Sequence, residues 1–234
     1  MKYLLRKKIA FIQAFGDLHG DPGWKNHINL NMDVIVFSGD FVDLRHLHLS
    51  YSAIIENLKE VLKLKEEYPE KIVLLWGNHD VSYLLSNTFN GLTEYQDYVS
   101  ELRRLFKQKQ ELFQAAYQKG NWLFTHAGLT KSFWQTTLRG TGTNYASIIN
   151  QRFSADPDLF DDLHLGHSGP LWASRYLFDN PDNWLPDLNQ VVGHSLVDRI
   201  TVNKYWGSQM IYINTGRFMY DHPAVCRVEI PNVP

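Results

Sequence analysis

Side chains that commonly bind catalytic metal ions recur in short glycine-containing segments of this 234-residue chain. They comprise two carboxylates, three imidazoles and one amide: Asp17, His19, Asp40, Asn78, His126 and His194. Oxygen and nitrogen donors in this mixture suit Mn, Fe, Zn or Ni better than Ca or Mg alone, and the thiolates of a structural zinc site are missing. The residue types therefore predict a metal centre that performs chemistry.

The ligands divide into two groups that share one carboxylate. The first group is Asp17, His19 and Asp40, and the second is Asp40, Asn78, His126 and His194. Two metal ions roughly 3.5–4 Å apart can hold a hydroxide between them and clamp the oxygens of a phosphate, and a metal-bound water reaches a pKa of about 7. We therefore expect two divalent ions bridged by Asp40, with the bridging hydroxide hydrolysing a phosphate ester.

Apolar segments must carry these side chains to a common edge of a sheet. The segment 34–37, Val-Ile-Val-Phe, is a continuous apolar run, as expected of a parallel strand that is covered on both faces. Ser38-Gly39 ends this run, and Asp40 follows at the carboxyl end of the strand, where open α/β sheets bind their ligands. The same pattern recurs at 8–15 before Gly16-Asp17 and at 71–76 before Gly77-Asn78.

Further strands are expected later in the chain. Expected strands that begin at Trp122 and Gln190 lead to His126 and His194, so they too end in a potential ligand. The remaining segments alternate or run apolar and predict a closing hairpin and an edge strand, at 199–203, 210–214 and 224–230.

Helical and irregular segments lie between these strands. Residues 51–67 have apolar side chains at the spacing of an amphipathic helix. The range 81–119 predicts a helical cap over the sheet edge, and 129–187, which Gly and Pro interrupt, predicts an irregular excursion that shapes a substrate cleft. We expect a single domain over 1–234, with these two ranges as cap-like excursions.

Composition narrows the class of protein. A formal net charge of -2 argues against a nucleic-acid platform, and the single cysteine, Cys226, cannot form an intramolecular disulfide. No apolar run approaches the ~20 residues that cross a bilayer, and the apolar part of 1–15 is short and has no cleavage site for a signal peptidase. We therefore expect a cytoplasmic enzyme that neither binds membranes nor needs an obligatory protein partner.

Five motifs in this order resemble those of the calcineurin-like metallophosphoesterases. They are Gly-Asp-Leu-His-Gly at 16–20, Gly-Asp-Phe-Val-Asp at 39–43, Gly-Asn-His-Asp at 77–80, Thr-His-Ala-Gly at 125–128 and Gly-His-Ser at 193–195. The closest resemblance is to the PPP-type serine/threonine phosphatases and the symmetrical dinucleoside-tetraphosphate hydrolases. It implies an α/β fold, α+β in some schemes, with four layers: a central β-sandwich flanked by helices, and a helical cap region.

The resemblance also implies roles for residues beside the ligands. His79 would be the general acid that protonates the leaving alkoxide, and Asp43 would hold its imidazole charged. Arginines of this family grip the phosphate, and Arg45 and Arg175 are the candidates here. Arg45 is displaced by one position from the Asp-Arg-Gly of the family, because the chain reads Asp43-Leu44-Arg45. Asn214 stands before Thr-Gly where the family usually has Asp, so its role is left open.

Three functions are compatible with these residues. The first is hydrolysis of a phosphomonoester, on a phosphorylated protein or a small phosphorylated molecule. The second is hydrolysis of a pyrophosphate bond in diadenosine tetraphosphate or a nucleotide, and the third is a scaffold without activity, which the complete ligand set and His79 disfavour. Phosphodiesterase relatives usually have Gly-His-x-His, whereas this chain has Leu196 at the second histidine, which favours the PPP-like arrangement.

Overall fold

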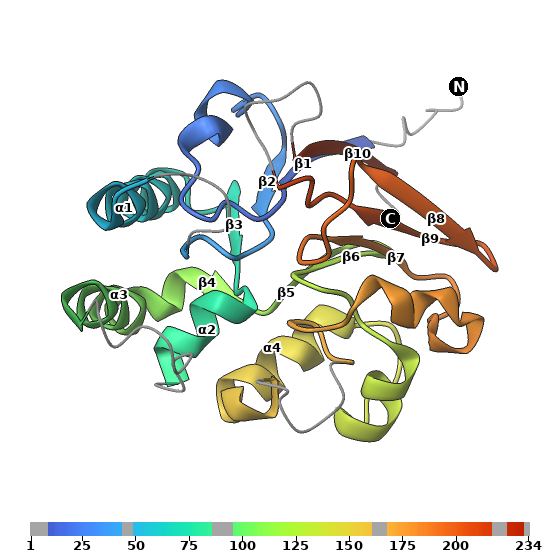
Figure 1. The fold of residues 1–234 in the computed structure, drawn as a ribbon. Helices are drawn as coiled ribbons and strands as arrows, with labels where there is room; N and C mark the ends of the chain where they lie inside the picture. Colours follow the sequence, from blue (N-terminus) through green and yellow to red (C-terminus); the bar gives the residue numbers. More distant parts are fainter. Residues whose placement is uncertain (1–8, 44–48, 86–95, 161–167, 217–223, 232–234) are drawn as a thin grey trace, which may run out of the picture.

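The computed structural model describes residues 9–43, 49–85, 96–160, 168–216 and 224–231. Two five-stranded sheets lie at its centre, and helices pack on their outer sides (Figure 1). The strands of the first sheet are β1 (Ile9–Phe15), β2 (Val34–Phe37), β3 (Ile72–Leu75), β4 (Phe113–Gln114) and β10 (Val225–Pro231). Their order is β10-β1-β2-β3-β4, and β10 alone among them runs antiparallel to its neighbour.

The second sheet has parallel strands at its centre and antiparallel strands at its edges. Its strands are β5 (Ala116–Lys119), β6 (Trp122–Thr125), β7 (Asn189–Val192), β8 (Thr201–Tyr205) and β9 (Ser208–Tyr212). Their order is β5-β6-β7-β9-β8, in which β6, β7 and β9 run parallel. The β8–β9 hairpin and the edge strand β10 confirm the predicted closing elements.

Helices cover the two sheets. They are α1 (Tyr51–Glu67), α2 (Asn78–Leu85), α3 (Gln96–Lys109) and α4 (Tyr145–Ala155), with short helical segments at Pro22–Asn26, Gln110–Leu112, Phe133–Thr137, Pro157–Phe160, Arg175–Asp179 and Pro181–Asn183. The bounds of α1 agree with the prediction, and Ser50 caps it by accepting a hydrogen bond from the amide of Ala53 at 3.2 Å. Within the described ranges every helix is too short or too polar to cross a bilayer.

Apolar side chains separate these layers into distinct cores. Between the two sheets lie side chains such as Ile12 and Val36 from the first sheet and Phe124 and Val191 from the second. The opposite face of the first sheet packs against the helices, because the side chains of a strand alternate between its faces. Burial on both faces explains why β2 and β3 are continuously apolar. The structure confirms the predicted α/β sandwich flanked by helices.

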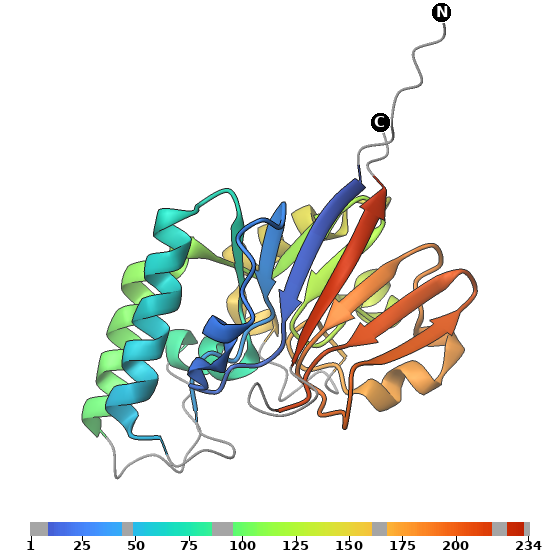
Figure 2. The same ribbon diagram turned by 90° about the horizontal axis from the view of Figure 1, so that it is seen from above.

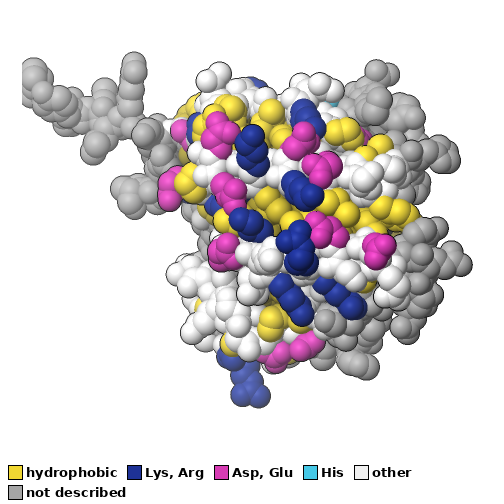
Figure 3. Space-filling model, turned by 90° about the vertical axis from the view of Figure 1, so that its left-hand side faces the viewer, with side chains coloured by type: hydrophobic (Ala, Val, Ile, Leu, Met, Phe, Trp, Pro, Cys, Tyr) yellow, Lys and Arg dark blue, Asp and Glu magenta, His cyan; other side chains and the backbone are white. Residues whose placement is uncertain are grey.

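The outer face of α1 and α3 carries mixed charge. Figure 3 shows acidic and basic side chains interspersed over this side of the molecule. Lys59 pairs with Glu56 at 2.8 Å, and Lys109 pairs with Glu66 at 2.7 Å. Exposed pairs of this kind contribute little to stability, so this face is a solvated surface.

The predicted helical cap at 81–119 is wrong over its last residues. α2 and α3 are helical as expected, and 86–95 lie outside the described residues. From Phe113 onward, however, the chain forms β4 and β5, which extend the first and second sheets by pairing with β3 and β6. Sheet pairing decides the conformation here, although Leu112 and Phe113 fit a helical pattern.

The range 129–187 also contains more regular structure than predicted. α4 buries Tyr145, Ile149 and Phe153, which repeat every four residues as on one face of a helix. The glycines and prolines that indicate an irregular segment lie outside Tyr145–Ala155, so they do not interrupt this helix.

Candidate metal centre and active site

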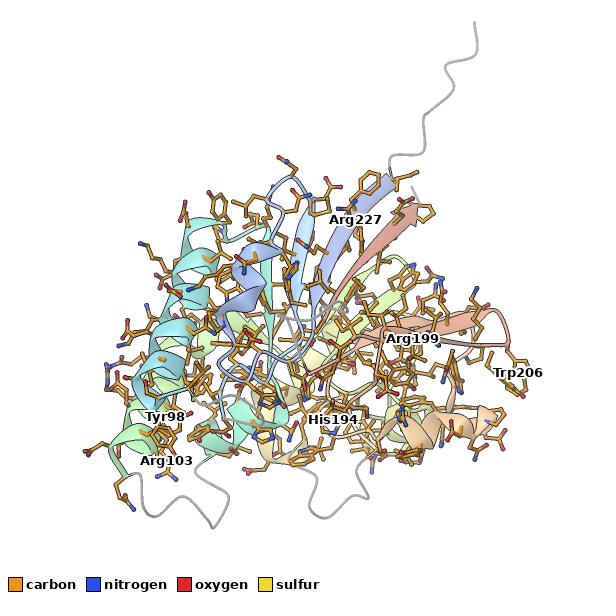
Figure 4. The ribbon with its side chains drawn as sticks, turned by 45° about the horizontal axis from the view of Figure 1, so that its top comes forward. Tyr98, Arg103, His194, Arg199, Trp206 and Arg227 are labelled. Carbon is orange, nitrogen blue, oxygen red and sulfur yellow. The ribbon has the colours of Figure 1, made fainter. Side chains whose placement is uncertain are left out.

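The expected metal ligands come together where the carboxyl ends of the parallel strands meet. In Figure 2 these strands run toward a common end of the molecule. Asp17 and His19 follow β1, Asp40 follows β2, Asn78 begins α2 after β3, His126 follows β6 and His194 follows β7. The described structure thus unites residues from both sheets, and Figure 4 shows His194 at this edge.

Asp40 belongs to two groups of side chains that could each hold a metal ion. Donor atoms of Asp17, His19 and Asp40 lie within 4.8 Å of one another, and so do those of Asp40, His126 and His194. Asp40 therefore lies close to the other candidate ligands of both predicted groups for which these distances hold, and the assignment of two ions stays a prediction. Asp40 is fully buried and has a φ of 52°, a left-handed conformation that Asp adopts more readily than most residues.

Two glycines allow the turns after β2 and β3 to approach each other. A Cβ atom on Gly39 would lie 2.5 Å from the amide nitrogen of Gly77, and Gly39 has a φ of 98°. A Cβ atom on Gly77 would collide with the backbone and carboxylate of Asp40. Both positions require glycine because the strand ends that carry Asp40 and Asn78 pack backbone to backbone.

The first group has donor atoms that the described protein leaves without hydrogen-bond partners. His19 Nδ1 lies 3.0 Å from the carbonyl oxygen of Val42 and 2.8 Å from that of Asp43, so it carries the proton and donates it there. His19 Nε2 then presents a lone pair 3.7 Å from Asp40 Oδ2. Both atoms are buried and have no hydrogen-bond partner among the described residues. A cation satisfies such a pair of acceptors, so the residues fit a metal ion.

The second group converges on the side-chain oxygen of Asn78. This Oδ1 lies 2.8 Å from His126 Nε2 and 3.0 Å from His194 Nδ1. His126 Nδ1 donates to the carbonyl oxygen of Ser38 at 2.7 Å, which leaves its Nε2 to act as a ligand. This hydrogen bond to a backbone carbonyl fixes the orientation of the His126 ring, as is usual for histidines that bind metal ions.

Charge in the site favours ionised Asp40. Burial by itself raises the pKa of Asp40, but the surrounding imidazoles of His126, His79, His19 and His194 outweigh burial and lower it below the usual value. At Asp17 burial prevails and raises the pKa, although His126 opposes it. Of these two carboxylates, Asp40 is therefore the one whose ionised form its neighbours stabilise.

Two residues hold Asp17 in place. The backbone amide of His194 donates to Asp17 Oδ1 at 2.9 Å, and Asn214 Nδ2 donates to Asp17 Oδ2 at 2.6 Å. Asn214 Nδ2 also donates to the carbonyl oxygen of His194 at 3.0 Å. Asn214 therefore holds Asp17 and the backbone of His194, which are candidate ligands from the two groups.

Asp80 supports the centre from behind, a role that sequence reasoning did not assign. Its Oδ2 accepts from the amides of Asp40 at 2.8 Å and Gly77 at 3.0 Å, and its Oδ1 accepts from the amide of Phe41 at 3.0 Å. Burial, followed by the charge of Asp40, raises the pKa of Asp80 well above its usual value, while the amides of Gly77 and Phe41 oppose this rise. The sequence did contain one signal for this role, because Asp80 directly follows His79 in the third motif.

His79 and Asp43 form a hydrogen-bonded pair beside the ligands. His79 Nδ1 lies 2.9 Å from Asp43 Oδ2, and His79 Nε2 lies 4.0 Å from Asp40 Oδ2. The backbone at Asn78 and His79 is helical, since α2 begins at Asn78. The two side chains diverge because successive helical residues point about 100° apart.

The two candidate arginines are placed differently. Arg45 lies outside the described residues. The amide of Arg175 donates to Ser195 Oγ at 3.0 Å, which places this backbone next to His194. Its guanidinium stacks over Tyr176, 5.0 Å from the ring centroid, and Nη2 donates to the Tyr176 hydroxyl at 3.4 Å.

One family of known proteins matches most of this chain. The model of the family described as calcineurin-like phosphoesterase matches residues 10–200. The chain belongs to this family. It is therefore a phosphoesterase, a class of hydrolase, and the family uses divalent metal ions. A search of curated proteins found no match.

Solved structures show the same fold at low sequence identity. A cold-active protein-tyrosine phosphatase of a psychrophilic Shewanella species is 17% identical with a TM-score of 0.63, covering 94% of this chain and 75% of that chain. A protein serine/threonine phosphatase from Saccharomyces cerevisiae with similarity to human phosphatase PP5 is 17% identical with a TM-score of 0.60, covering 96% and 81%. These likenesses confirm the metallophosphoesterase fold.

Proposed function

We propose that this calcineurin-like phosphoesterase is a phosphomonoesterase that works with two divalent metal ions. The observation that carries the proposal is the position of Asp40, whose buried carboxylate is shared by two groups of ligand atoms. Its Oδ2 has no hydrogen-bond partner among the described residues, as expected of an oxygen that binds cations.

The residues that would hold the ions follow from the two groups. Asp17, His19 and Asp40 would hold one ion, and Asp40, Asn78, His126 and His194 would hold the other. Mn, Fe, Zn or Ni fits these oxygen and nitrogen donors. When bound, such ions supply a water nucleophile at neutral pH and neutralise charge on the phosphate.

His79 has the geometry of a general acid. Asp43 accepts at Nδ1, so the proton available to a substrate is on Nε2, the nitrogen nearer to Asp40. The carboxylate of Asp43 stabilises the protonated imidazole, which can then give its Nε2 proton to a leaving alkoxide. This role explains why the pair stands beside the ligands.

The substrate proposed is a phosphomonoester, on a protein or a small molecule. Leu196, 46% exposed, stands where diesterases of this superfamily usually have a second histidine, which supports the monoesterase assignment. Arg175 is the described candidate for a phosphate clamp, because its backbone is anchored to Ser195 beside His194. Arg45 keeps its place as a second candidate.

A substrate panel tests the proposal. Enzyme loaded with manganese is offered a phosphoserine peptide, p-nitrophenyl phosphate, bis-p-nitrophenyl phosphate and a dinucleoside tetraphosphate. We expect the two monoesters to be hydrolysed with the highest kcat/KM. Preference for the tetraphosphate would replace the proposal by pyrophosphate hydrolysis, and preference for the bis-aryl ester would replace it by diesterase activity.

A further inference from the structure

The carboxylate of Asp43 has a strong second partner besides His79. Its Oδ2 faces His79 Nδ1, and its Oδ1 accepts a hydrogen bond from the Tyr83 hydroxyl at 2.5 Å. The side chain of Asp43 is 15% exposed, so little water competes for these oxygens. Each oxygen is thus bound to a different side chain of α2, four residues apart, and the orientation of the carboxylate is determined from two sides.

The backbone of Asp43 does less to fix that orientation. Its φ is 68°, in the left-handed region that residues with a side chain seldom adopt. The hydrogen bond from its amide to the Tyr98 hydroxyl is long, at 3.4 Å. The carboxylate therefore depends on its side-chain partners to keep Oδ2 in line with His79.

Tyr83 is well suited to hold this position. Tyr83 as a whole residue is 1% exposed, and its ring packs against Phe106 at 6.2 Å and against Tyr98 at 6.4 Å between centroids. A packed tyrosine ring has few conformations, so its hydroxyl has a defined place. Burial, and then the charge of Asp43, raises the pKa of Tyr83, so the hydroxyl stays protonated and can donate to the carboxylate.

We propose that Tyr83 is a positioning residue for the general acid, holding the Asp43 carboxylate so that its other oxygen orients the His79 imidazole. This inference rests on the proposed function, because it assumes that His79 is the acid. Tyr83 acts through Asp43 and touches neither the substrate nor a reacting atom. It also connects the acid to α3, since Tyr83 packs on Tyr98 and Phe106 of that helix (Figure 4 labels Tyr98).

Tyr98 provides an internal comparison. Its hydroxyl also reaches Asp43 Oδ1, but at 3.5 Å, which is the limit of a hydrogen bond, whereas that of Tyr83 is at 2.5 Å. The two hydroxyls therefore face the same oxygen with very different strength. Replacement of Tyr98 by Phe should cost clearly less activity than replacement of Tyr83 by Phe.

The experiment compares two substrates in Tyr83→Phe. Phosphoserine has a poor leaving group that needs protonation, and p-nitrophenyl phosphate has a good one that needs little. We expect kcat for phosphoserine to fall roughly tenfold, a fraction of the ~10²–10⁴ that a positioned acid contributes, with KM and metal content unchanged. For p-nitrophenyl phosphate kcat should fall less than about twofold. An equal loss on both substrates would overturn the proposal.

A double-mutant cycle with Asp43→Ala tests the route of the effect, because alanine leaves no acceptor for the Tyr83 hydroxyl. If Tyr83 acts through the Asp43 carboxylate, Tyr83→Phe should have almost no further effect in the Asp43→Ala enzyme. The same fold-loss in both backgrounds would mean that Tyr83 acts elsewhere. Tyr117→Phe, which removes the hydroxyl of a β5 tyrosine packed on Phe124, controls for loss of a hydroxyl as such.

Two further measurements keep the inference separate from the proposed function. If His79→Asn slows the hydrolysis of both substrates equally, the acid role of His79 fails, and the inference on Tyr83 fails with it. If the loss of kcat in His79→Asn depends on the leaving group but the loss in Tyr83→Phe does not, only the inference on Tyr83 fails. Circular dichroism and thermal melting check folding of each variant. Should Tyr83→Phe not fold, 4-fluorophenylalanine at this position fills the space without a donor and should show the same dependence on leaving group.

Discussion

Removal of the Asp80 carboxylate should weaken the protein even when no metal is bound. Asp80 is fully buried and accepts hydrogen bonds from the amides of Asp40, Phe41 and Gly77. Each buried donor left without a partner costs about 1–3 kcal/mol. Three such donors in Asp80→Ala would together lower the free energy of unfolding by roughly 3–9 kcal/mol. Movement of neighbouring groups reduces this loss, and we expect about 3 kcal/mol, which lowers Tm by roughly 6–12 °C in a chain of this size.

The distribution of these bonds predicts a smaller loss for Asp80→Asn. Oδ2 accepts two amides and Oδ1 accepts one. An asparagine whose carbonyl oxygen takes the place of Oδ2 keeps the first two bonds and turns its NH2 group toward the amide of Phe41. One donor is then unpaired, so we expect about 1–3 kcal/mol, less than for Asp80→Ala.

Denaturant unfolding in the presence of a chelator measures both variants without a contribution from bound metal. Asp158→Ala is the control, because it removes an exposed carboxylate and should change the free energy of unfolding by less than about 0.5 kcal/mol. If Asp80→Ala were no more destabilising than Asp158→Ala, or if Asp80→Asn cost as much as Asp80→Ala, the three amides would not depend on this carboxylate and the reasoning would be refuted.

Other variants test the site and the core. Asp40→Asn should abolish activity and lower metal content while the fold stays intact, and it should reduce activity more than Arg175→Ala does. Kinetics measures the activity and elemental analysis the metal content. If the two variants lost equal activity and equal metal, Asp40 would not be a shared ligand. His79→Asn should lower kcat for phosphoserine by ~10²–10⁴ with metal content nearly unchanged, and loss of a metal would show that it is a ligand. Burial raises the pKa of Cys226 to about 12, so an aromatic disulfide reagent at pH 8 should label it only after unfolding, and rapid labelling of native protein would argue against a packed thiol.

Local patterns in the sequence were enough to predict α1 and the strands that carry the ligands. Residues 51–67 repeat apolar side chains with the period of a helix, and a glycine stands directly before Asp40 and before Asn78, at the end of an apolar run. These signals act within a few residues, so they do not depend on the rest of the fold. The choice of metal-binding residue types is equally local, since it follows from the chemistry of each side chain.

Tertiary structure decided the features that depend on distant partners. Phe113–Gln114 and Ala116–Lys119 are strands because β3 and β6 offer them hydrogen bonds, which no local pattern reveals. Tyr83 lies 40 residues from Asp43 in the sequence, and Asn214 lies 197 residues from Asp17, so only folding shows that they hold these carboxylates. The sequence by itself determined which groups can do the chemistry; the packing of two sheets, which buries them together and excludes water, determined how each one is oriented.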